Sequence, residues 1–90
     1  WAQGEKRIPK PPSHYYKKHV YSCFFKDTVG IDLLDRIGED NVLFETDYPH
    51  QDGTFPNTLA IAEDLFGHLE QETIDKIARN NAIKLFGLTI

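Results

Sequence analysis

The side chains best suited to chemistry gather in one polar segment, residues 45–56. In order they are Glu45, Thr46, Asp47, Tyr48, His50, Gln51, Asp52 and Thr54. An aspartate in such a segment can bind a divalent metal through one oxygen, or accept the proton of a metal-bound water. His50 can contact a substrate or orient Asp47, and Pro49 restricts the backbone between them. Asp47 is therefore our candidate catalytic and metal-binding residue, and Tyr48 and His50 are candidate substrate contacts.

The same residue types also occur for purely structural reasons. Asp-x-Pro is common in turns, and an aspartate after a strand often caps the next helix. A lone histidine is more often a surface or hydrogen-bonded residue than a ligand, and His14, His19 and His68 have no metal-ligand spacing. The single cysteine, Cys23, lies in an apolar run, which favours packing over catalysis. Residue types and spacing alone thus leave the role of Asp47 open.

Two short apolar runs predict the strands that position this segment. Val20–Phe25 and Asn41–Phe44 are apolar on both faces apart from a few positions, as in buried parallel strands. The connection between them, about fifteen residues, carries a helical pattern capped by Asp27 or Thr28 and closed by Gly38. A connection of this length favours a right-handed parallel unit over a hairpin.

Helices are expected on both sides of this unit. Ser13 can cap a short helix over His14–Lys18. A helix beginning at Asn57 or Thr58 should end at Gly67, and a last helix should be interrupted at Asn80–Asn81. The predicted fold class is therefore α/β, with about two parallel strands and three to four helices. Ligands bind at the carboxyl ends of parallel strands, where Asp47 is expected.

Composition narrows the classes of partner. The formal net charge is −4, from ten Lys and Arg against fourteen Asp and Glu. This balance is poor for sequence-independent nucleic-acid binding, although basic residues concentrate in residues 6–18 beside several tyrosines. That run is short and broken by prolines, which favours a solvated helix end. No apolar stretch approaches the about 20 residues of a membrane span, and the single cysteine fits a cytoplasmic protein.

Several motifs together resemble the amidohydrolase-related family. Asn41–His50 resembles the strand-8 motif of these metal-dependent (β/α)8-barrel enzymes, which include the aminocarboxymuconate-semialdehyde decarboxylase group. Pro12-Ser13 followed by Tyr15 resembles the segment before strand 7, and Ile37–Asn41 resembles the approach to strand 8. Asn81–Leu88 resembles the closing helix. The similarity covers nearly all of residues 11 to 88 in the right order.

The resemblance implies hydrolysis or non-oxidative decarboxylation of a small molecule at a divalent metal, which we expect to be zinc. Asp47 matches the strand-8 aspartate, which binds the metal or engages its activated water. His50 matches a residue beside the substrate pocket in some members. Glu45 departs from the pattern, because relatives often have glycine there.

The resemblance also implies missing parts. The family's His-x-His on strand 1 and its histidines on strands 5 and 6 are absent from this sequence, and a barrel needs about 250 residues. We therefore expect residues 1–90, which begin without methionine, to be a C-terminal fragment with strands 7 and 8 and the terminal helices. Alone it should bind no metal, be inactive, and form a homo-oligomer or pair with the missing N-terminal part. The alternatives are a non-catalytic oligomerising module and a small anion or nucleic-acid binder.

Overall fold

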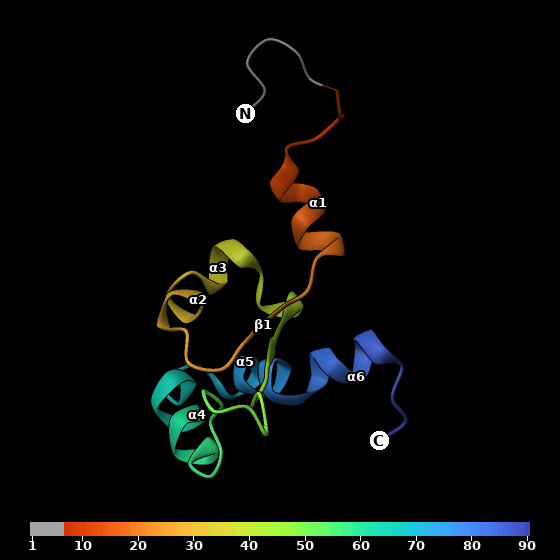
Figure 1. Cartoon of the computed structure of the whole chain (residues 1–90). Helices are drawn as coiled ribbons and strands as arrows, with labels where there is room; N and C mark the ends of the chain where they lie inside the picture. Colours follow the sequence, from red (N-terminus) through yellow and green to blue (C-terminus); the bar gives the residue numbers. More distant parts are fainter. Residues whose placement is uncertain (1–6) are drawn as a thin grey trace.

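In the computed structural model, residues 7–90 are described, and they form an α/β unit around a two-stranded sheet (Figure 1). The elements are α1 (Pro12–His19), β1 (Ser22–Phe24), α2 (Thr28–Asp32), α3 (Leu34–Ile37), η1 (Glu39–Asn41), β2 (Val42–Phe44), α4 (Thr58–Phe66), α5 (Gln71–Asp75), η2 (Lys76–Asn80) and α6 (Asn81–Phe86). The strands are parallel, with Ser22 opposite Val42 and Phe24 opposite Phe44. The predicted fold class, strand order and strand direction are confirmed.

The connection between the strands follows the predicted cap residues but contains two short helices. Asp27 caps α2 by accepting a hydrogen bond of 3.0 Å from the Val29 amide. Leu33 leaves the helical conformation, with φ −108° and ψ 16°, and separates α2 from α3. Gly38 then ends α3 with φ 97°, a conformation that glycine adopts without steric cost. Because the single helix predicted between the strands is divided into α2 and α3, the described residues contain more helices than the three to four predicted.

The predicted cap at Ser13 is wrong. Pro11 is the N-cap of α1, Pro12 occupies the first turn, and Ser13 lies inside the helix. Proline suits this position because its φ is already helical and its missing N–H would have no partner in the helix. The start of α1 is therefore set by proline geometry and not by a side-chain hydrogen bond.

A hydrophobic cluster packs α2, α3, α4 and η2 against the sheet. Its buried members are Phe24, Ile31, Leu34, Val42, Leu65, Phe66 and Ile77. Phe24, Phe44 and Phe66 meet edge to face, with ring centroids 5.4 to 6.5 Å apart. The neighbouring side chain on β1, Cys23, is exposed. The prediction that the first strand is buried on both faces is therefore wrong, because β1 buries Phe24 but exposes Cys23.

The C-terminal helices run on without the interruption predicted at Asn80–Asn81. Both residues have right-handed helical backbone angles, and the π-helical turn η2 joins α5 to α6. The Asn81 amide is buried and donates hydrogen bonds to the carbonyls of Glu39 (2.7 Å) and Val42 (2.8 Å). Asn81 therefore links α6 to β2 instead of breaking the helix.

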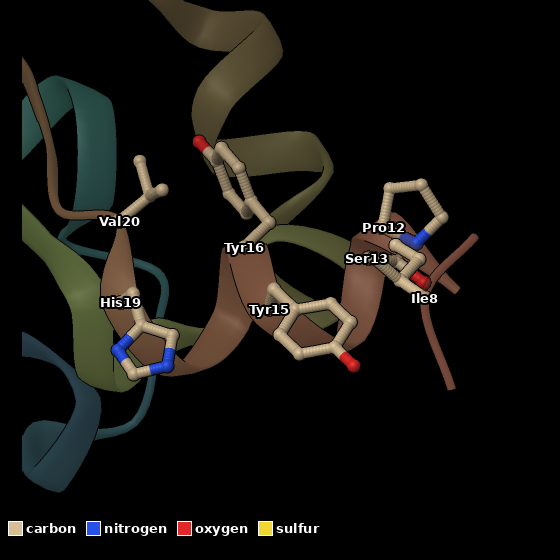
Figure 2. A pocket seen from close by; sticks show the side chains of 7 residues that line it. All are labelled: Ile8, Pro12, Ser13, Tyr15, Tyr16, His19 and Val20. Atoms are coloured by element: carbon tan, nitrogen blue, oxygen red, sulfur yellow. The ribbon is translucent and has the colours of Figure 1, made fainter. Parts of the chain in front are cut away.

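Helix α1 extends away from the rest of the molecule (Figure 1) and has no buried residue. It is attached through Asn41, whose amide donates to the carbonyls of Lys17 and Val20. An apolar hollow lies along this helix, and Figure 2 shows the side chains that line it: Ile8, Pro12, Ser13, Tyr15, Tyr16, His19 and Val20. Within residues 7–90, no helix is both long and apolar enough to span a membrane.

Candidate active site

The segment of interest begins where the sheet ends. Glu45 extends the ladder by one bond, donating its N–H to the Phe24 carbonyl at 3.0 Å. Asp47 follows two residues later, with a side chain 42% exposed. It therefore lies beyond the carboxyl end of a parallel strand, the position that the sequence predicted. Its catalytic role stays a prediction.

Asp47 has an uncommon backbone conformation. Its φ is 55°, in the left-handed region that most residues with a side chain avoid. Aspartate is among the few residues that adopt this region as single positions. Such conformations cost free energy, and they persist where the surrounding structure holds them. The direction of the Asp47 side chain is thus set by the fold of the whole segment.

Backbone hydrogen bonds hold that segment in two consecutive turns. The His50 amide donates to the Asp47 carbonyl at 2.8 Å, and the Gly53 amide donates to the His50 carbonyl at 3.0 Å. The Thr54 amide donates to the Thr46 carbonyl at 2.9 Å and closes the loop at its base. Residues 46–54 therefore form a loop with fixed ends.

The structure brings Asp47 and His50 together. Asp47 Oδ2 lies 3.3 Å from His50 Nδ1, and the imidazole is 63% exposed. The same nitrogen lies 3.3 Å from the Asp52 amide. One nitrogen cannot donate and accept in the same protonation state. A protonated Nδ1 therefore donates to Asp47, whereas an unprotonated Nδ1 accepts from Asp52. His50 is placed to orient the Asp47 carboxylate in the first of these states.

Tyr48 is exposed and contacts a second aromatic residue. Its ring lies edge to face with Phe55, at a centroid distance of 5.0 Å, and both side chains are about two-thirds exposed. Together with Thr46 and Thr58 they line a shallow hollow. The sequence predicts a role for Tyr48 but none for Phe55, because no local pattern indicates that residues 48 and 55 meet across a loop.

Glu45, the residue that departs from the family pattern, faces a different hollow. This hollow, about 400 Å³, is lined by Cys23, Phe24, Phe25, Lys26, Asp27 and Glu45. Partial burial raises the pKa of the Cys23 thiol, and the Glu45 carboxylate raises it further. Cys23 therefore stays protonated at neutral pH, but the burial predicted for it is wrong, because its side chain is exposed.

Asp47 suits one position of a metal site. A half-exposed carboxylate is a hard oxygen donor of the kind that divalent cations accept. Among residues 7–90, no three His, Cys, Asp or Glu side chains are arranged to hold a metal ion. A protein metal site commonly takes three or four protein ligands. The residues present thus fit a single ligand of such a site.

Comparison with known proteins places the chain in one family. A family model described as amidohydrolase matches residues 2–88, nearly the whole chain. No curated protein matches the chain. The family level of the predicted resemblance is confirmed, and the decarboxylase-like subgroup stays a prediction.

Proposed function

The chain belongs to the amidohydrolase family, and on this premise we propose that it is the C-terminal part of a metal-dependent enzyme. The reaction is hydrolysis of a C–N or C–O bond, or non-oxidative decarboxylation, of a small molecule. The observation that carries this proposal is Asp47, a carboxylate in a left-handed backbone conformation beyond the carboxyl end of β2.

The proposed roles follow from the geometry of the loop. Asp47 serves as a metal ligand or as the base that accepts a proton from the attacking water. Its two roles both need a fixed carboxylate, and the imidazole 3.3 Å away supports one orientation. His50 and Tyr48 contact the substrate through their exposed faces. A bound divalent metal, which we propose to be zinc, supplies a water with a lowered pKa.

The number of strands supports a larger protein. A closed (β/α)8 barrel has eight strands and about 250 residues. The described part of this chain has two strands, so each strand has one edge that no other strand pairs. In the proposed enzyme, the remaining strands cover these edges and supply the other metal ligands. The 90-residue chain alone should then have no turnover.

The first experiment tests this by direct assay. The purified 90-residue chain is incubated with zinc or manganese and a panel of amides, lactones and aromatic acids. We expect no metal-dependent turnover above that of the matched Asp47→Ala chain. Turnover that requires both the metal and Asp47 would show that this chain makes a complete site by itself.

The second experiment uses Asp47→Asn in the proposed intact enzyme. Asparagine keeps the size and suits the same turns, but it lacks the negative charge and the basicity. We expect the rate to fall by a factor on the order of 10² or more, as for loss of a positioned acid–base group. Asp35→Asn is the matched control, because Asp35 is an exposed residue of α3 outside the loop.

Turnover, metal content and thermal unfolding are measured on both variants. Normal stability with a lost rate assigns Asp47 to the chemistry, and reduced metal content further assigns it to the metal. Near-normal turnover in Asp47→Asn removes Asp47 from the mechanism and refutes the proposed function.

A second candidate is a non-catalytic module that binds another copy of this chain. It is favoured by the open sheet edges and by the exposed apolar surface on α1 and the residue after it, which includes Tyr16 and Val20 (Figure 2). Charge complementarity supports a second copy as the partner. Residues 7–19 carry lysine and arginine but no carboxylate, whereas acidic residues outnumber basic ones in residues 20–90. Self-association that is weakened by salt would support this candidate.

A further inference from the structure

The loop that carries Asp47 is built around a glycine. A Cβ atom added to Gly53 would lie 2.8 Å from the Thr46 carbonyl oxygen, 2.9 Å from that of Asp47 and 3.1 Å from that of His50. All three neighbours are backbone atoms, so none can rotate away as a flexible side chain could. Position 53 therefore admits a side chain only if the backbone of residues 46–50 moves.

The next residue holds the same loop from its base. Thr54 is 1% exposed, and its amide donates to the Thr46 carbonyl at 2.9 Å. Its hydroxyl lies 3.4 Å from that carbonyl and 2.9 Å from the hydroxyl of Thr58, in the first turn of α4. Thr54 thus joins the start of the loop to the start of the following helix.

These two residues act on the peptide groups on either side of the Asp47 Cα atom. The Thr46 carbonyl precedes Asp47; it accepts from the Thr54 amide and borders the space that a Cβ atom of residue 53 would occupy. The Asp47 carbonyl follows; it accepts from the His50 amide and borders the same space beside Gly53. Fixing both peptide planes fixes φ and ψ of Asp47, and with them the direction of its Cα–Cβ bond.

We propose that Gly53 and Thr54 are positioning residues that hold Asp47 in its left-handed conformation and aim its carboxylate. The proposal rests on the proposed function of Asp47 for its catalytic consequence. Neither residue touches the reacting atoms in this scheme. Gly53 acts through the absence of a side chain, and Thr54 acts through a buried hydroxyl and amide.

Two substitutions disturb the two contacts separately. Gly53→Ala places a methyl group against three carbonyl oxygens and shifts the Thr46–Asp47 peptide. Thr54→Val keeps the shape of the side chain but removes the hydroxyl that meets Thr58. Because a displacement of about 1 Å can cost on the order of 10²-fold in rate, we expect kcat to fall about 10- to 100-fold in Gly53→Ala and several-fold in Thr54→Val. In Thr54→Val, KM should change less than kcat, since no group is added against the backbone of Tyr48 and His50.

The controls match the chemistry of each change. Gly30→Ala adds the same methyl group at ordinary van der Waals distance, 3.7 Å from the Asp27 side chain, and should leave kcat unchanged. Thr54→Ser restores the hydroxyl lost in Thr54→Val and should recover most of the rate. A purely structural role would instead lower the amount of folded enzyme without separating kcat from KM.

The backbone itself gives a readout that does not depend on activity. The φ angle of Asp47 is measured in the wild-type and Gly53→Ala chains, by crystallography or by NMR coupling constants, together with metal content of the enzyme. We expect φ to leave the region near 55° in Gly53→Ala. An unchanged φ together with normal kcat would overturn the proposal, as would Thr54→Ser losing as much rate as Thr54→Val.

These outcomes are separable from failure of the proposed function. If Asp47→Asn is inactive while Gly53→Ala is normal, only the positioning proposal fails. If Asp47→Asn is fully active while φ of Asp47 moves in Gly53→Ala, the proposed function fails and the conformational role of Gly53 stands. If Gly53→Ala does not fold, the comparison of kcat between Thr54→Val and Thr54→Ser still tests the positioning proposal.

Discussion

The buried amide of Asn81 should be one of the strongest single contributions to stability in this chain. It is 5% exposed and donates two hydrogen bonds, to Glu39 and Val42, across 42 and 39 residues of sequence. In a parallel strand the N–H and C=O groups of one residue point to the same side, and those of the next residue point to the opposite side. The Glu45 N–H points to Phe24 on β1, so the Val42 carbonyl, three residues earlier, points away from β1. Asn81 therefore satisfies an acceptor at the open edge of β2.

The cost of removing this amide follows from those two bonds. Each contributes about 1 kcal/mol net, and a carbonyl left buried without a partner costs about 1–3 kcal/mol. Asn81→Ala should thus reduce the free energy of unfolding by about 2–3 kcal/mol. For a domain of this size, 1 kcal/mol corresponds to roughly 4–8 °C in Tm. Asn81→Asp should cost at least as much, because it presents a carboxylate oxygen to two carbonyl oxygens.

The assay is urea unfolding of the 90-residue chain, followed by circular dichroism at constant pH. Asn80→Ala is the matched control, since Asn80 is the adjacent asparagine, is exposed, and makes a 3.3 Å bond only with the neighbouring Arg79 among the contacts described. If the free energy of unfolding of Asn81→Ala lies within about 0.5 kcal/mol of that of Asn80→Ala, the range of surface substitutions, the two buried hydrogen bonds do not stabilise the fold in this way.

Three further predictions concern reactivity, pH and assembly. Partial burial and the Glu45 carboxylate raise the pKa of the Cys23 thiol, so iodoacetamide should modify Cys23 more slowly than a free thiol at pH 8. Glu45→Gln should speed this reaction, and equal rates in the wild-type and Glu45→Gln chains would contradict the prediction. Hydrogen bonds from Lys76 and Thr73 hold the pKa of Glu39 below its ordinary 4.5. The Glu39 carboxylate therefore stabilises the fold above pH 4.5, and this stabilisation is lost as the pH falls through the lowered pKa. The Tm of Glu39→Gln should accordingly fall less than that of the wild type between pH 6 and pH 3, and parallel curves would exclude the effect. The open edges of the two-stranded sheet should cause self-association at micromolar concentration, measured by light scattering, and a monomeric, cooperatively folded species would count against it.

Much of the fold could be predicted from local sequence. The apolar runs around residues 20–25 and 41–44 predicted both strands, and the length of the connection predicted their parallel direction, because a hairpin needs only a short turn. The caps at Asp27 and Gly38 were also predictable, since they depend on a side chain and a backbone conformation within one helical turn. The position of Asp47 beyond the second strand followed from the same local order.

Other features were decided by contacts between distant residues. Local preferences of asparagine predicted a break at Asn80–Asn81, yet burial against β2 keeps Asn81 helical and uses its amide elsewhere. The pairing of Tyr48 with Phe55 likewise depends on the closed path of the loop.

The sequence by itself determined which residues could do chemistry and in which order the elements occur. The tertiary structure decided in which direction the side chains of these residues point. The left-handed backbone of Asp47 depends on Gly53 and Thr54, six and seven positions further along the chain, whose contacts exist only once the loop has closed. Side-chain type is a property of one residue, whereas direction is a property of the packing around it, and a pattern of single residues contains no record of that packing.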